Sequence, residues 1–220
     1  MLISHRKARP LTRETSDYRD DRLFIVACDD TYAPAQYFEF FRIERVKIHV
    51  VPTTNTKSHA QYVLDNLMGI ECREDDELWM ILDTDHCIKA GHIRSFIAAL
   101  REAKKKGINV ALSRSCFEVW LLLHHISENE VRNLGSAAEV EAKLKAVLGS
   151  YNKTLLDGSH FPLKSVVDAY RRALRLDAAT ENEMIPRVTT TRVYRFWQSI
   201  ITGASVSQLP EELRELKMLE

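Results

Sequence analysis

The feature that most constrains this chain is a five-residue apolar run, Leu78 to Leu82, which leads directly into Asp83 and Asp85. The run contains no Gly or Pro and no charge, which is typical of a buried strand in a parallel sheet. In open α/β sheets, binding sites lie at the carboxyl ends of the strands. With the two-residue period of a strand, both carboxylates point to one side and can share a divalent cation. The pair also fits a solvated turn, so this pattern alone leaves metal binding open.

Three other apolar runs alternate with amphipathic segments along the chain. Strands are expected over residues 23–28, 46–51 and 108–112, and helices over residues 34–42, 58–68 and 88–106. Parallel neighbouring strands need crossover connections, and helices in those connections cover both faces of the sheet. The sequence therefore predicts a doubly wound α/β fold with a mainly parallel four-stranded sheet.

Helical periodicity continues beyond the fourth strand, over residues 136–148, 163–176, 190–202 and 210–219. We expect a basic N-terminal arm over residues 1–22, a catalytic domain over residues 23–126 and a helical extension packed on it over residues 127–220. The final helix places Leu209, Leu213 and Leu216 along one face, where we expect an exposed surface for a partner.

Composition excludes several classes of protein. The 31 basic and 31 acidic residues cancel, so no overall positive field attracts nucleic acid, and such contacts must come from local patches. No apolar stretch reaches the about 20 residues of a membrane span, and the start of the chain lacks a signal peptide, which predicts a cytoplasmic protein. The four cysteines show no Cys-x-x-Cys spacing and are interpreted as reduced thiols.

Acids also occur near two other predicted strands. Asp29 follows the first strand, and Glu118 lies in the first turn of an apolar helix after the fourth. The helix dipole explains a glutamate at that position as well as a role in a metal site does. Lys153 lies in a predicted loop and is either an ordinary surface lysine or a group that neutralises phosphate charge.

Four segments together resemble the RloB-like family of bacterial proteins. The first is Ile-Val-Ala-Cys-Asp-Asp, followed after four residues by Ala-Gln-Tyr-Phe; the others are Leu-Asp-Thr-Asp, Ser-Arg-Ser-Cys-Phe-Glu-Val-Trp-Leu-Leu-Leu-His-His and Tyr-Asn-Lys. The similarity runs from residue 22 to about residue 200. It implies a Toprim-type catalytic fold, related to the nuclease part of OLD-type proteins. The family occurs in phage-defence loci, often beside an ABC-type ATPase.

The resemblance implies a metal-dependent nuclease that acts on DNA or RNA, including transfer RNA. Its catalytic residues would be Lys153 and four acids that bind Mg²⁺ or Mn²⁺: Asp29, Asp83, Asp85 and Glu118. The family's first motif has Glu followed by Gly, and Asp29 and Asp30 stand at those two positions. Aspartate is one methylene shorter than glutamate, which makes a substrate oxygen harder to reach.

Two alternatives to a nuclease follow from the same residues. A protein with a weakened acidic site would serve as a binding or regulatory subunit that docks on an ABC-type ATPase. In either case we expect an ABC-type ATPase partner, a homo-oligomer, or both. Haloacid-dehalogenase phosphatases also begin with Asp-x-Asp, but they carry Thr or Val four residues after the first Asp, where this chain has Cys87. The phosphatase reading is therefore disfavoured.

Overall fold

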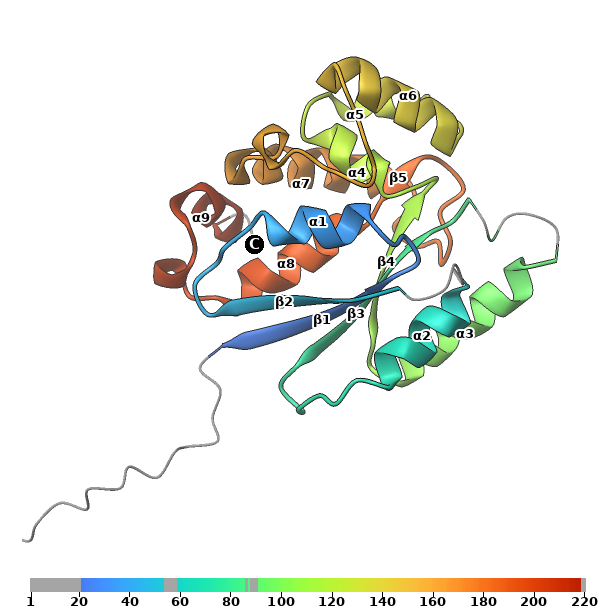
Figure 1. The fold of residues 1–220 in the computed structure, drawn as a ribbon, viewed down its shortest axis with the longest axis vertical. Coiled ribbons are helices and arrows are strands. Elements are labelled where there is room, and N and C mark those ends of the chain that lie inside the picture. Colours follow the sequence, from blue (N-terminus) through green and yellow to red (C-terminus); the bar gives the residue numbers. More distant parts are fainter. Residues whose placement is uncertain (1–20, 54–58, 86, 88–90, 219–220) are drawn as a thin grey trace, which may run out of the picture.

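A five-stranded sheet forms the centre of the computed structural model, which describes residues 21–53, 59–85, 87 and 91–218 (Figure 1). The strand order is β2-β1-β3-β4-β5. The first four strands are parallel, and the short β5 pairs antiparallel with β4. The strands are β1 (Arg22–Cys28), β2 (Val46–Val51), β3 (Glu77–Asp83), β4 (Asn109–Arg114) and β5 (Thr190–Thr191). The predicted basic arm lies, up to residue 20, outside the described residues.

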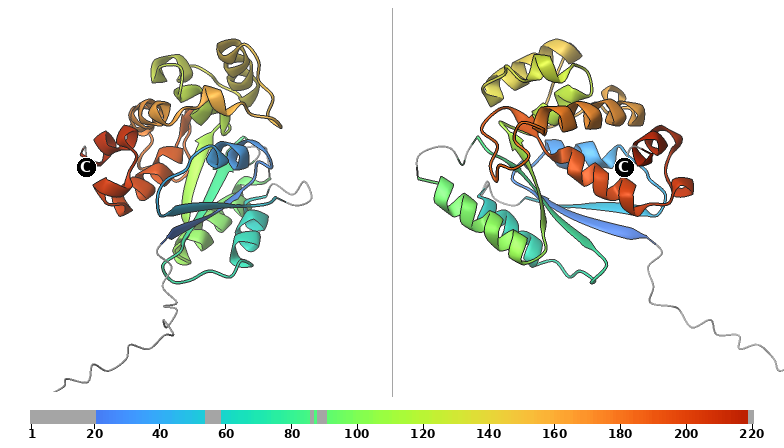
Figure 2. Two further views of the ribbon diagram at one scale, coloured as in Figure 1. Left: turned by 60° about the vertical axis from the view of Figure 1, so that its left-hand side comes forward. Right: turned by 180° about the vertical axis from the view of Figure 1, so that it is seen from behind.

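Helices cover both faces of the sheet, which confirms the doubly wound α/β prediction (Figure 2). Phe24 and Val26 of β1 face a core shared with α1 (Ala33–Glu39) and α8 (Val193–Gly203). Ile25 and Ala27 face the opposite core, shared with α2 (Ala60–Met68) and α3 (Ile93–Lys105). This alternation is the period of two that a strand buried on both faces requires.

The remaining helices lie on the α1 side of the sheet (Figures 1 and 2). They are α4 (Glu118–Leu123), α5 (Glu128–Val131), α6 (Ala137–Leu148), α7 (Leu163–Asp177) and α9 (Glu211–Lys217), with 3-10 helices at Gly158–His160 and Val206–Gln208. Apolar side chains of α4, α7, α8 and α9 extend the core that covers this face. No helix within the described part of the chain is long and apolar enough to cross a membrane.

The structure corrects the predicted number of strands. Residues 190–202 were expected to form one helix, but Thr190 and Thr191 form β5 and the helix begins at Val193. The Thr191 hydroxyl lies 2.9 Å from that of Ser113, and the Arg192 backbone N–H donates to the Leu112 carbonyl at 2.8 Å. Pairing with β4, more than 70 residues away in sequence, thus makes a strand of two threonines, whose β-branched side chains favour strands over the helix that the periodicity of the segment predicts.

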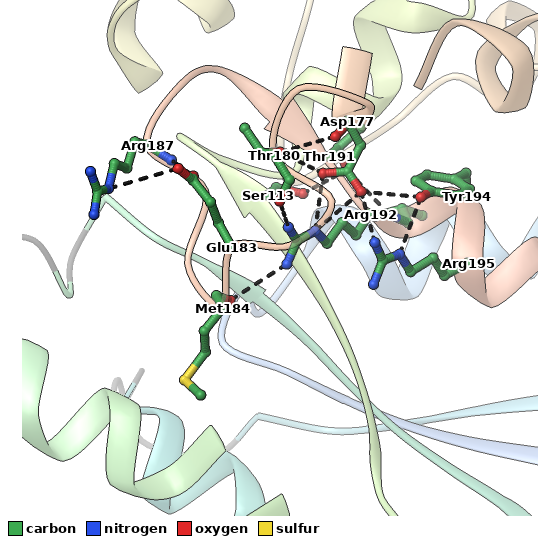
Figure 3. A network of polar contacts seen from close by, with 11 residues as sticks. Ser113, Asp177, Thr180, Glu183, Met184, Arg187, Thr191, Arg192, Tyr194 and Arg195 are labelled. Atoms are coloured by element: carbon green, nitrogen blue, oxygen red, sulfur yellow. Dashed lines mark hydrogen bonds and ion pairs between the residues drawn. The ribbon is translucent and has the colours of Figure 1, made fainter. Parts of the chain in front are cut away.

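A buried ion-pair network holds the segment that leads into β5 (Figure 3). Nε of Arg192 donates to both carboxylate oxygens of Asp177, at 3.1 and 3.2 Å. Asp177 also accepts from Arg195 at 2.9 Å and from the Tyr194 hydroxyl at 3.1 Å. Arg192 further donates to the Thr180 carbonyl at 2.6 Å. The network therefore ties the end of α7, the following loop and the start of α8 together.

The prediction of an exposed apolar face on the last helix is wrong. Leu209, Leu213 and Leu216 are at most 2% exposed and belong to the core on the α1 side of the sheet. Their spacing did predict a common face, but that face packs inward. These leucines stabilise the protein itself and offer no surface to a partner.

Candidate metal centre

Three neighbouring parts of the sheet deliver acids to its C-terminal edge. Strand β1 pairs with β3, where Cys28 aligns with Ile81, and β3 pairs with β4, where Asp83 aligns with Ser113. The acids that follow β1 therefore lie beside the end of β3, and α4 begins a few residues after β4. The chain moves outward to β2 on one side and to β4 on the other, so this is the switch point where α/β sheets place ligands.

Asp30, Asp83 and Glu118 form what we call the carboxylate cluster. Each contributes one oxygen, and these three atoms lie within 4.8 Å of one another. The side chains of Asp30 and Glu118 are 3% exposed, and Asp83 as a whole is 8% exposed. Three carboxylates that lie this close together and are shielded from solvent repel one another strongly unless cations balance their charge.

Asp30 is oriented by the turn into α1. One oxygen, Oδ1, accepts the backbone N–H groups of Tyr32 and Ala33 at 2.8 and 3.4 Å. The other oxygen, Oδ2, lies 2.8 Å from the Nζ atom of Lys153. The short polar side chain thus satisfies the open backbone at the helix entrance and still points an oxygen into the cluster.

Glu118 is held in the cluster by two groups from the loop that follows α6. The Tyr151 hydroxyl donates to Oε1 at 2.8 Å, and Lys153 Nζ lies 3.3 Å from the same oxygen. Burial raises the pKa of Glu118, but the charge of Lys153 and the hydrogen bond from Tyr151 outweigh it, so its pKa is lowered overall. Glu118 is therefore ionised at neutral pH.

Asp83 is the uncompensated member of the cluster. No described residue gives its carboxylate a hydrogen bond or an ion pair. The charge of Lys153 is near enough to lower the pKa of Asp83, but by less than the other groups raise it. Burial, and then repulsion from Asp29, Glu118 and Asp30, raise the pKa of Asp83 well above its usual range. A hard divalent cation would relieve that repulsion, and an all-oxygen ligand set suits Mg²⁺ or Mn²⁺. The residues present thus fit the metal that the resemblance implied.

A family model described as RloB-like protein matches residues 24–200 of the chain. The chain belongs to the RloB-like family. Comparisons with curated proteins and with solved structures gave no match. The family match runs from β1 into α8, so it includes the carboxylate cluster and Lys153 of this RloB-like protein.

The structure brings together only some of the predicted site residues. Asp83, Glu118 and Lys153 meet at the cluster, together with Asp30. Asp29 turns toward the backbone, where its Oδ2 accepts the N–H of Asp83 at 2.9 Å. Burial, together with repulsion from neighbouring acids, raises the pKa of Asp29 to about 8. Asp85, two residues after Asp83, is not one of the three residues of the carboxylate cluster.

Two residues that the structure places at this RloB-like site are not predicted by the sequence pattern. Asp30 was assigned to the family's Gly position, and Tyr151 was noted only as part of a motif. Two adjacent acids after a strand were the available signal for Asp30. Strand alternation sends adjacent side chains to opposite sides, so local pattern could not tell which acid faces the cluster. The turn into α1 decides in favour of Asp30.

Proposed function

We propose that this RloB-like protein is a Mg²⁺- or Mn²⁺-dependent nuclease that hydrolyses phosphodiester bonds and acts as an effector in bacterial anti-phage defence. The observation that carries the proposal is the uncompensated Asp83 carboxylate within a buried carboxylate cluster beside a lysine. Nucleases commonly use acidic residues for metal ions and cationic groups for phosphate. Family membership supports the defence role.

The mechanism assigns separate tasks to the residues. Asp30, Asp83 and Glu118 would hold the ion, which supplies Lewis-acid polarisation of the phosphodiester and activation of water. The flanking Asp85 remains proposed as a further metal ligand, whereas Asp29, also predicted as a ligand, takes a separate task. Burial lowers the pKa of Lys153, but Glu118 and Asp30 outweigh burial and raise it, so the ammonium remains charged. That charge can stabilise the phosphate as negative charge develops.

Asp29 is the residue we assign to proton transfer. In the metal-free protein burial raises its pKa to about 8, so the carboxyl group holds a proton that it would release as a nearby cation lowers that pKa. Its Oδ2 is fixed by the backbone N–H of Asp83, which orients the carboxyl group beside the cluster. This role follows from the burial of Asp29 and from the backbone hydrogen bond that fixes it. Because the side chain is shorter than that of glutamate, the substrate oxygen must approach Asp29 closely.

A regulatory subunit that docks on an ABC-type ATPase or on a second copy of the chain is the second candidate. One observation favours it: a single ammonium already contacts two of the three carboxylates of the cluster, so part of the charge is balanced without metal. A subunit of this kind would keep the fold and bind no divalent cation.

The deciding experiment measures Mn²⁺ binding by calorimetry and Mn²⁺-dependent cleavage of DNA and transfer RNA with the full chain. Asp83→Asn should weaken binding at least about tenfold and abolish cleavage, since it removes a charged ligand. Asp168→Asn, at an exposed position on α7, is the matched control and should leave both unchanged. Cleavage by Asp83→Asn at the rate of the unmodified protein would refute the site. No Mn²⁺ binding by the unmodified protein would favour the regulatory subunit.

A further inference from the structure

We infer that Lys153 is the resident counter-ion of the carboxylate cluster, that a divalent cation displaces it, and that Gln36 positions the loop that carries it. This inference rests on the proposed function, because it concerns how the proposed metal site is filled. It adds a coupling: the ion that completes the cluster also releases the ammonium that would bind phosphate.

The first step concerns the position of the ammonium. Nζ of Lys153 lies 2.8 Å from Asp30 Oδ2 and 3.3 Å from Glu118 Oε1, so it lies against two members of the cluster. A Mg²⁺ ion binds carboxylate oxygens at about 2.1 Å. An ion on those two oxygens would therefore lie within a few ångströms of the ammonium, where two cations repel. Lysine and metal compete for the same carboxylates.

The second step concerns what can move. The Lys153 side chain is 39% exposed, whereas the carboxylates that it contacts are 3% exposed. Lysine carries its charge on a flexible four-carbon stem, so a rotamer change toward solvent moves the ammonium without moving the backbone. The acids are fixed by the turn into α1 and by Tyr151. Metal entry is accommodated by the lysine.

The third step concerns Gln36, which lies on α1 and reaches across to this loop. Its Nε2 donates to the Lys153 carbonyl at 3.0 Å, and its Oε1 accepts the backbone N–H of Leu156 at 2.9 Å. The same Nε2 also donates to the carbonyl of Tyr32, within its own helix region, at 3.0 Å. One amide group therefore fixes the backbone at Lys153 and again three residues further along the loop, at Leu156. Gln36 is a positioning residue that keeps the ammonium within reach of both cluster and substrate.

Amine labelling followed by mass spectrometry tests the displacement directly. In metal-free protein, Lys153 should react several-fold more slowly than Lys164, which lies exposed on α7. Saturating Mn²⁺ should accelerate labelling of Lys153 by about threefold or more and leave Lys164 unchanged, because an amine released from its two ion pairs is more exposed to the reagent. Labelling of Lys153 that is unchanged or slowed by bound Mn²⁺ would overturn the inference.

Calorimetry with Lys153→Met provides the second readout. Loss of the competing ammonium should tighten Mn²⁺ binding by about threefold to tenfold, whereas Lys164→Met should not change it. Equal or weaker binding by Lys153→Met, with normal binding by the unmodified protein, overturns the inference and leaves the proposed function standing. Failure of both proteins to bind Mn²⁺ overturns the proposed function itself.

The role of Gln36 is tested with Gln36→Leu and Gln36→Glu. Gln36→Leu should speed metal-free labelling of Lys153 relative to Lys164 and reduce the response to Mn²⁺, because the loop loses both anchors. Gln36→Glu keeps the acceptor for Leu156 and loses the donor to the Lys153 carbonyl, so its effect should be intermediate. A lower melting temperature with an unchanged labelling ratio would show a merely structural role and refute positioning.

Discussion

At the residue scale, two acids of similar burial differ because their partners differ. Glu118 receives a hydrogen bond from Tyr151 and lies beside Lys153, which keep its pKa low. Asp83 has neighbours of its own charge, and burial together with those neighbours raises its pKa. In metal-free protein, an ionised Asp83 therefore opposes folding, as expected of a site built for a ligand rather than for stability.

Asp83→Asn should stabilise the metal-free protein, by on the order of 1 kcal/mol. The amide has nearly the same size as the carboxylate, so the change removes repulsion without opening a cavity. Denaturant unfolding in the presence of EDTA at pH 8 measures the free energy of unfolding. Asp168→Asn, on the exposed face of α7, serves as the control. A variant less stable than the unmodified protein would show that the Asp83 charge is compensated.

Stability and metal affinity should depend on pH in opposite directions. The folded-state pKa of Asp29 is raised from 3.8 to about 8, and that of Asp83 is raised as well. Their stabilising protons are fully present below an ordinary carboxyl pKa and are lost as pH rises through the folded-state value. The metal-free free energy of unfolding should therefore fall between about pH 4 and pH 8 through these groups.

Mn²⁺ binds the ionised carboxylates, so its affinity should rise over the same interval. Unfolding and calorimetry at several pH values measure both trends, and Asp83→Asn should flatten them. A metal affinity independent of pH would contradict the raised pKa values.

At the scale of elements, the segment that connects α7 to α8 contains β5, the fifth strand of the sheet, and its position depends on a buried ion pair. Arg192 follows β5 directly and is 5% exposed, while Asp177 at the end of α7 is 1% exposed. Removing one partner of a buried ion pair leaves a costly unpaired charge. The pair therefore specifies how the segment around β5 docks on β4, although each charge alone would oppose burial.

Arg192→Met should lower the free energy of unfolding by about 3 kcal/mol. Asp177 would keep Arg195, Tyr194 and the Thr180 hydroxyl, which limits the loss. Arg187→Met, in the loop before β5 and with a side chain 87% exposed, should change stability by less than about 0.5 kcal/mol. Thermal and denaturant unfolding of both variants measure the difference. Equal effects of the two substitutions would contradict the role assigned to the buried pair.

At the scale of the whole molecule, the two faces of the sheet carry cores of different extent. The face with α2 and α3 is closed by those two helices, whereas the other face is covered by α1 and α8, with α4, α7 and α9 packed beyond them. The C-terminal helix is thus part of the main core. A truncation there would unfold the protein before it could report on a partner.

Leu213→Ala should lower the free energy of unfolding by about 2–5 kcal/mol, since Leu213 is 0% exposed and its removal leaves a cavity. Leu155→Ala, at a leucine that is 73% exposed, is the matched control and should have little effect. Chemical denaturation measures both. A small effect of Leu213→Ala would restore the idea that this helix face is available to a partner.

Local pattern was enough to determine the order and type of most elements of this protein. The strand at residues 46–51 and the helices near residues 136–148 and 163–176 were predicted nearly to their ends. The period of the apolar residues predicts buried strands and amphipathic helices, and that period is a local property of the sequence. The acids at the strand ends likewise indicated the edge of the sheet where the carboxylate cluster lies, because parallel strands bring their carboxyl ends to one edge.

Tertiary structure alone decided which side chains meet. Thr190 and Thr191 form a strand because they pair with β4. The leucines of α9 face inward because they pack in the core with α7 and α8. Asp30 entered the carboxylate cluster through a turn, and Gln36 found its loop 117 residues away in sequence. Such contacts depend on positions fixed by the whole fold, and no local period encodes them. The physical reason is that burial and hydrogen bonding stabilise contacts between residues that are close in space, whatever their separation along the chain.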